Sequence, residues 1–182
     1  MKTIRIEIFG ILDICKSEFK GVYMEQKNMG NRIEKVREYV DDVLLHMTDI
    51  VERRCAYLHL YGVAQACAMI AQKRKADVEL AIVAGMLHDI FSYKTMKHQD
   101  HAHKGAVMAK EILDELDIFD DKEIAMICDA IYNHSDRAAT HTSFTEVLID
   151  ADVLQHYLYN PFFSVSGSEK MRLENLKREF YL

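Results

Sequence analysis

The sequence predicts an all-α protein, a single-domain helical bundle of about seven helices around one core. Two observations lead to this prediction. The 182 residues include 7 glycines and 1 proline, too few for the many tight turns of a β-sandwich or a β-barrel. From residue 31 onward, apolar residues recur every three or four positions, which is the period of amphipathic helices.

The N-terminal residues do not share this pattern. Ile4, Ile6 and Ile8 alternate with charged residues, as in a β-strand, but no partner strand is evident in the sequence. We therefore expect two segments: a leader over residues 1–30 that lies outside the core, and a helical domain over residues 31–182.

The first helices of this domain follow from the apolar periodicity. We expect them at about residues 31–47, 52–73 and 76–91, each with an apolar stripe that faces the core. The next stretch, from Phe91 to Asp100, is polar and is predicted to be a loop.

Capping residues predict where the later helices begin. Ser143 and Glu146 form the S-x-x-E pattern of a capping box, in which each side chain binds a backbone N–H of the first turn. The same pattern recurs at Ser166 and Glu169 before a charged final helix, and Pro161 ends the preceding helix. The expected N-caps are Asp100, Asp120 or Asp121, Ser143 and Ser166.

Charge, cysteine content and hydropathy narrow the class of protein. The formal net charge of −6 disfavours a general nucleic-acid binder, which usually presents a basic face. No stretch approaches the roughly 18 uncharged apolar residues of a membrane span, so no membrane partner is expected. The 4 cysteines form no CxxC pair, and we expect reduced thiols in a cytoplasmic protein.

Histidines and aspartates occupy positions that should face the dry core. A single histidine on an apolar face is most often an ordinary core residue, and a single aspartate in an apolar run is most often a surface residue. Buried carboxylates cost several kcal/mol unless they are paired, hydrogen-bonded or bound to metal. Four separate helices place such residues inward, which favours a shared metal site: His59; His88 and Asp89; His134; Asp150 and Asp152.

Three glycines inside predicted helices support a shared centre. Gly62 follows His59 by three residues, Gly85 precedes His88 by three, and Gly105 lies one turn after a histidine as well. Glycine in a helix costs up to about 1 kcal/mol relative to alanine, so each position needs a compensating reason. We expect close helix approach around the polar centre, with tight packing and no metal as the alternative.

The order of these residues resembles the HD superfamily of metal-dependent phosphohydrolases. The matching contexts are H-L-Y-G-V-A-Q-A, A-G-M-L-H-D-I and I-D-A-D-V-L, and the order and spacing of these residues cover residues 52–158. The resemblance implies a bundle of the HD-domain type around a metal site. It also implies the second Asp of the D-A-D run as the ligand, Asp152 in preference to Asp150. The implied metal ligands are His59, His88, Asp89 and Asp152.

Some HD proteins bind a second metal through further histidines between the His-Asp doublet, here His88 and Asp89, and the last Asp, here Asp152. His101 and His134 lie at suitable places, and His101 is preferred to His103 because of its H-x-x-x-G-A context. Asp89 would then bridge the two ions. His156 shows no comparable pattern. The implied cofactor is one or two divalent transition-metal ions, Mn, Fe, Co, Ni or Zn, with Mg as a further candidate.

Such a site implies hydrolysis of a small phosphorylated substrate, a phosphomonoester or phosphodiester that is a nucleotide or a phosphometabolite. Metal-activated water would attack phosphorus, with Asp89 to orient the water. Arg54 and Lys94 are candidate catalytic cations, and Arg137 is a further cation close to a predicted ligand. The chain lacks a carboxylate shortly after the His88–Asp89 doublet and lacks a Gly-Tyr-Pro signature, so the sequence does not identify the substrate. Formation of a homo-oligomer stays open as well.

Two other functions fit the same residues. A two-iron HD-type oxygenase would use six ligands arranged as His59, His88, Asp89, His101, His134 and Asp152. A non-catalytic sensor would bind a nucleotide or a metal without turnover. Metal analysis separates the hydrolase from the oxygenase, and a phosphatase panel separates the enzyme from the sensor.

Overall fold

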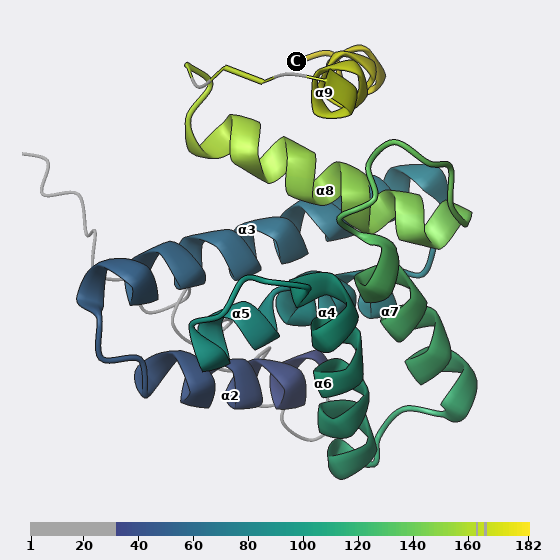
Figure 1. Cartoon of the computed structure of the whole chain (residues 1–182). Helices are drawn as coiled ribbons and strands as arrows, with labels where there is room; N and C mark the ends of the chain where they lie inside the picture. The colour runs from purple at the N-terminus through teal and green to yellow at the C-terminus, as the bar shows by residue number, and fades with distance from the viewer. Residues whose placement is uncertain (1–31, 163, 166) are drawn as a thin grey trace, which may run out of the picture. The chain divides into compact units, whose positions relative to one another are not determined.

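The computed structural model describes residues 32–162, 164–165 and 167–182, and it is all-α over these residues (Figure 1). This confirms the predicted fold class. The predicted leader over residues 1–30 lies outside the described residues. Ser166, at which the second S-x-x-E pattern begins, lies outside them as well. The described helices are α2 (Arg32–Leu45), α3 (Ile50–Arg74), α4 (Val78–Leu87), α5 (Ile90–Thr95), α6 (His101–Leu116), α7 (Asp121–Asn133), α8 (Ser143–Tyr159) and α9 (Gly167–Phe180).

The predicted helix over residues 76–91 is two helices. The backbone leaves helical geometry at Asp89, with φ −111° and ψ 13°, and restarts as α5. The prediction of a loop from Phe91 to Asp100 is therefore wrong for its first half. Ile90 and Ser92 of α5 are buried, so tertiary packing stabilises a helical turn that the polar local sequence did not predict.

The structure confirms the predicted helix cap at Asp120 but not the one at Asp100. Asp120 forms a full capping box with Glu123 at the start of α7, as expected. Asp100 precedes α6 but does not cap it through its side chain, because its backbone is left-handed with φ 59°. Its carboxylate instead lies 2.7 Å from His103 Nδ1.

The capping box of α8 is shifted by one residue from the prediction. Thr142, and not Ser143, is the N-cap, and its hydroxyl accepts a hydrogen bond from the Thr145 N–H at 3.1 Å. Glu146 accepts a hydrogen bond from the His141 N–H at 2.9 Å. The two side chains thus satisfy free N–H groups at the entry to α8 in the manner of a capping box displaced along the chain.

Close helix approach at the three glycines is confirmed. A Cβ on Gly85 of α4 would lie 2.7 Å from the Ala64 Cα of α3, so these backbones touch. A Cβ on Gly62 would lie 2.9 Å from Gln155 Cγ of α8, on another side of α3. A Cβ on Gly105 would lie 3.0 Å from the His88 carbonyl oxygen. The small residues draw α3, α4, α6 and α8 together around one polar region.

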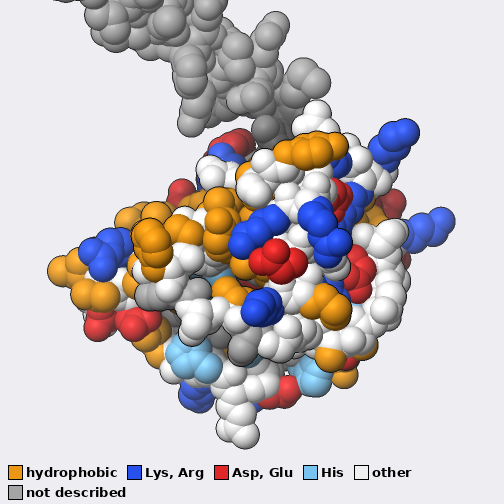
Figure 2. Space-filling model, turned by 90° about the horizontal axis from the view of Figure 1, so that it is seen from above, with side chains coloured by type: hydrophobic (Ala, Val, Ile, Leu, Met, Phe, Trp, Pro, Cys, Tyr) orange, Lys and Arg blue, Asp and Glu red, His pale blue; other side chains and the backbone are white. Residues whose placement is uncertain are grey.

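Helix α8 is buried on nearly all sides, since α3, α4 and α7 pack on it from below and α9 covers it from above (Figure 1). The face seen from the α9 side carries intermingled basic and acidic side chains (Figure 2). None of the described helices has both the length and the apolar character that a membrane crossing requires.

Candidate metal centre

The helix ends bring the predicted metal ligands together. His88 is the C-cap of α4, Asp89 follows it in the break before α5, and His134 is the C-cap of α7. His101 is the first residue of α6, and His59 lies within α3. His88 and His134 are almost fully buried, as expected of groups that face a core.

Asp89 lies between two pairs of imidazoles. Its Oδ2 atom is 3.4 Å from His59 Nε2 and 3.6 Å from His88 Nε2. Its Oδ1 atom is 3.5 Å from His101 Nε2 and 3.6 Å from His134 Nε2. One carboxylate therefore faces four histidines, two of which lie in α3 and α6 and two at the C-terminal ends of α4 and α7.

Asp152 completes one side of this cluster from α8. Its Oδ1 atom is 3.7 Å from His59 Nε2 and 3.4 Å from His156 Nε2. Its Oδ2 atom accepts a hydrogen bond from the Arg137 guanidinium. Asp150 points the other way, because two residues along a helix are about 200° apart. It forms ion pairs with Arg74 at 2.8 Å and with Arg172 at 3.0 Å.

All four imidazoles around Asp89 use Nδ1 to bind an oxygen acceptor. Since a carbonyl or carboxamide oxygen only accepts, each Nδ1 must carry the hydrogen, and each neutral ring then turns the lone pair of Nε2 toward the carboxylates. The pairs are His59 with Gln155 Oε1 at 3.0 Å, His88 with Gly85 O at 2.8 Å, His134 with Ile131 O at 2.6 Å, and His101 with His98 O at 3.1 Å.

The centre therefore holds many acceptors and few donors. His59 Nε2 and His88 Nε2 are only 3.0 Å apart, although neither neutral ring offers a proton there. The Oδ1 atoms of Asp89 and Asp152 are buried and accept no hydrogen bond among the described residues. The Ser135 hydroxyl, 3.0 Å from His101 Nε2, supplies a single proton. Converging lone pairs of this kind fit a divalent cation.

The electrostatics of the centre favour the same conclusion. Burial opposes ionisation of Asp89 and Asp152, but the surrounding imidazoles outweigh it and hold the pKa of each carboxyl below its usual range. Burial lowers the pKa of His88 to about 4, so this ring is neutral at pH 7, as a metal ligand must be. Burial also lowers the pKa of His59 and His134, but Asp89 reverses that effect and raises both. The cluster attracts positive charge.

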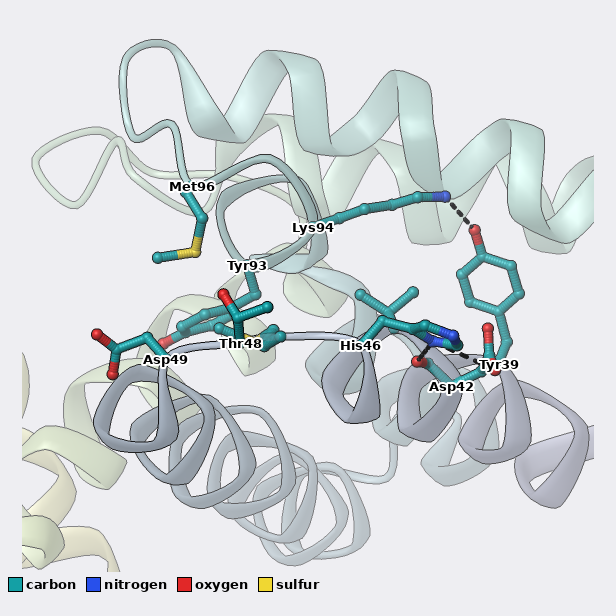
Figure 3. A pocket seen from close by; sticks show the side chains of 10 residues that line it. Tyr39, Asp42, His46, Thr48, Asp49, Tyr93, Lys94 and Met96 are labelled. Atoms are coloured by element: carbon teal, nitrogen blue, oxygen red, sulfur yellow. Dashed lines mark hydrogen bonds and ion pairs between the residues drawn. The ribbon is translucent and has the colours of Figure 1, made fainter.

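Two predicted catalytic cations do not reach this centre. Arg54 precedes His59 by five residues, which places it roughly 140° away around α3, and it is exposed. The Lys94 ammonium donates to the Tyr39 hydroxyl at 2.8 Å instead (Figure 3). The expectation that these two side chains approach the ligands is corrected, because their helices turn them toward other surfaces.

Two residues of α8 were not predicted at the site. His156 stacks on His59 with the ring centroids 5.5 Å apart, and its Nδ1 lies 3.0 Å from Glu169 Oε1. Gln155 binds His59 Nδ1, as described above. The spacing from Asp152 to His156 is four residues, the separation that places two side chains on one helix face, and this signal was available in the sequence.

A pocket of 350 Å³ opens onto the centre. It gives a small molecule access to the partly exposed edge of the cluster, and its walls are mainly aromatic and imidazole rings. The residues that line it include His59, Asp89, Tyr93, Gln155, His156 and Tyr159.

The fold and the His–Asp cluster define a helical protein with a candidate metal centre, and comparison with known proteins identifies the family. The family model of the HD domain matches residues 56–160, more than half of the chain. The chain therefore belongs to the HD domain family. A predicted HD superfamily hydrolase from an uncultured Thermotogales bacterium, known from its crystal structure, shares the fold. Its TM-score is 0.56 at 23% identity, with 85% of this chain and 94% of that chain covered. No curated protein matches the sequence.

Metal counting tests whether the two imidazole pairs bind separate ions. We expect two metal equivalents in the wild type after reconstitution, because Asp89 faces both pairs. His101→Ala and His134→Ala should each reduce this to about one equivalent. His103→Ala is the matched control, since its ring stacks on Tyr132 outside the cluster. A single equivalent in the wild type that persists in both variants would establish a one-metal centre.

Gln155 is expected to support the centre through the tautomer of His59. Gln155→Leu removes the acceptor of the His59 Nδ1 proton and should weaken metal affinity about 10- to 100-fold, the usual effect of losing such a partner. Gln65→Leu, on the exposed side of α3, is the control. Competition titration with a chelating dye measures the affinity, and equal affinities in both variants would refute this role.

Proposed function

We propose that this protein is a metal-dependent phosphohydrolase that acts on a small phosphomonoester or phosphodiester. The observation that carries the proposal is the position of Asp89, whose two ionised oxygens each face a pair of imidazole lone pairs. Membership of the HD domain family supports a hydrolase of this kind.

The chain offers ligands for two ions that share Asp89. His59 and His88 lie close enough to Asp89 to share one ion with it, and His101 and His134 to share another. Asp152, which lies close to His59 and His156, would complete the first set. A divalent metal bound there would supply a nucleophilic hydroxide near neutral pH and polarise a phosphoryl oxygen. The candidate metals are Mn, Fe, Co, Ni and Zn, with Mg as a further candidate.

The residues around the ligands hold them in place and admit the substrate. The Arg137 guanidinium binds Asp152 and also lies 3.2 Å from Glu169, so its charge is shared between two carboxylates. His156 lies at the pocket wall, with Nε2 3.4 Å from Asp152 and Nδ1 3.0 Å from Glu169, so both of its ring nitrogens face carboxylates. Arg137 and His156 would therefore both position Asp152.

The pocket size and chemistry fit a small phosphorylated substrate, a nucleotide or a phosphometabolite, in preference to a nucleic acid. Its aromatic walls, with Tyr93 and Tyr159, suit a ring or another flat group. We also propose a cytoplasmic location, on the basis of the free cysteines Cys55, Cys67 and Cys128.

A two-iron oxygenase is the second candidate function. The shared position of Asp89 between two imidazole pairs favours it, because that chemistry needs both ions. Iron analysis and a visible absorption band in protein purified without chelators would support it, whereas phosphatase activity with redox-inert metals would exclude it as the main function.

A phosphatase panel tests the proposal directly. We expect protein loaded with Mn²⁺, Co²⁺, Ni²⁺ or Mg²⁺ to release phosphate from at least one nucleotide or sugar phosphate, and chelation to abolish the release. Asp89→Asn should lower the rate by more than about 100-fold, beyond the usual effect of losing an outer partner. Asp114→Asn, at an exposed pair with Lys110, should leave it unchanged. Metal binding without hydrolysis of any substrate would favour the sensor.

A further inference from the structure

A second cavity lies beside the pocket of the metal centre, between α2, the α2–α3 connection and α5 (Figure 3). Its volume is 560 Å³. Apolar and aromatic side chains form part of its wall, and two basic side chains line it as well. The residues that matter here are Tyr39, His46, Met47, Tyr93, Lys94 and Met96.

Tyr93 lines both this cavity and the pocket of the metal centre. Its ring centroid lies 6.4 Å from that of His59, and Asp89 contributes to the raised pKa of its phenol, after burial. Lys94 is the next residue along α5. Tyr93 is therefore a wall that the two cavities share, and Lys94 lies one residue beyond it in the second cavity.

The charges of the two cavities differ. No Lys or Arg occurs among the described residues that line the metal-centre pocket. In the second cavity, Lys94 Nζ donates to the Tyr39 hydroxyl at 2.8 Å and lies 5.3 Å from the centre of that ring. No ion pair joins Lys94 to a carboxylate of the described residues. An ammonium has three donors, so two of them stay available to a ligand.

The two acidic residues that line the cavity differ in their contacts. The Asp49 carboxylate accepts hydrogen bonds from the Val51 and Glu52 N–H groups, because Asp49 is the N-cap of α3. The Asp42 carboxylate is largely exposed and lies 3.6 Å from His46 Nδ1, which binds the Asp42 carbonyl oxygen at 2.7 Å. Lys94 is thus the cation of this cavity that is free to bind an anion.

We propose, on the basis of the function proposed above, that the substrate is a phosphoester with a second anionic group, and that Lys94 binds this group. The scissile phosphate would lie at the His–Asp cluster, and the connecting portion would pass Tyr93. Tyr39, Met47 and Met96 would contact that portion. The second group is a phosphate or a carboxylate, since both match a compact ammonium.

Binding of a remote group has a defined kinetic consequence. Interactions with parts of the substrate that do not react can be used to position the reacting centre, so their loss lowers kcat/KM for substrates that carry the group. A substrate without the second anion cannot use the interaction. The ratio of kcat/KM between the two kinds of substrate therefore isolates the contribution of Lys94 from any general effect on folding or on the metal.

The experiment compares alkanediol bisphosphates of increasing length with alkyl monophosphates of equal length. In the wild type, the ratio of kcat/KM should favour the bisphosphates above a minimum length that spans Tyr93. Lys94→Met should reduce this ratio about tenfold, as expected for a lost charge-assisted hydrogen bond. Lys122→Met, an exposed lysine on α7, is the matched control and should preserve the ratio. Carboxyalkyl phosphates show whether a carboxylate replaces the second phosphate.

Titration calorimetry with the corresponding alkane bisphosphonates, which are not hydrolysed, tests the Lys94 site separately from the proposed phosphohydrolase function. Weaker bisphosphonate binding by the Lys94→Met variant than by the Lys122→Met variant supports the Lys94 site, even if no phosphoester is hydrolysed and the proposed function fails. Hydrolysis with an unchanged ratio, together with unchanged bisphosphonate affinity in Lys94→Met, would overturn the Lys94 site and leave the proposed function in place.

Discussion

An excess of hydrogen-bond acceptors at the centre of the bundle is the constraint on which the rest of the structure depends. Four imidazoles direct Nε2 lone pairs at the carboxylate of Asp89, and Asp152 adds a further buried oxygen without a donor. A positive charge at the centre stabilises such an arrangement. The helix break at Asp89 and the glycines at positions 85 and 105 serve this convergence, because they let α3, α4 and α6 approach closely.

The C-terminal part of the chain supports the centre from outside. Glu169 of α9 accepts hydrogen bonds or ion pairs from both Arg137 and His156, and these two residues are the ones that contact Asp152 outside the imidazole pairs. On the opposite face of α8, Asp150 is neutralised by two arginines. Helix α8 can therefore bury two aspartates two residues apart, one for the site and one for the docking of α9.

Much of the fold and of the site could be predicted from sequence. Helical periodicity predicted the bundle, and polar residues at inward positions predicted a shared polar centre, because a buried charge needs a specific reason. The choice of His59, His88, Asp89 and Asp152 as the ligands came from the resemblance to the HD superfamily. The direction of a long side chain could not be predicted in the same way. Lys94 turns to Tyr39 because α5 exists and has a defined rotation, and α5 forms only through tertiary packing.

Anomalous X-ray scattering from crystals grown with Mn²⁺ would test the central claim most directly. Two peaks should flank the Asp89 carboxylate, one beside His59 and His88 and the other beside His101 and His134. A single peak within the first pair would restrict the centre to one ion. No peak near Asp89, with all four Nε2 atoms hydrogen-bonded to water or to protonated partners, would contradict the assignment of this cluster as a metal centre.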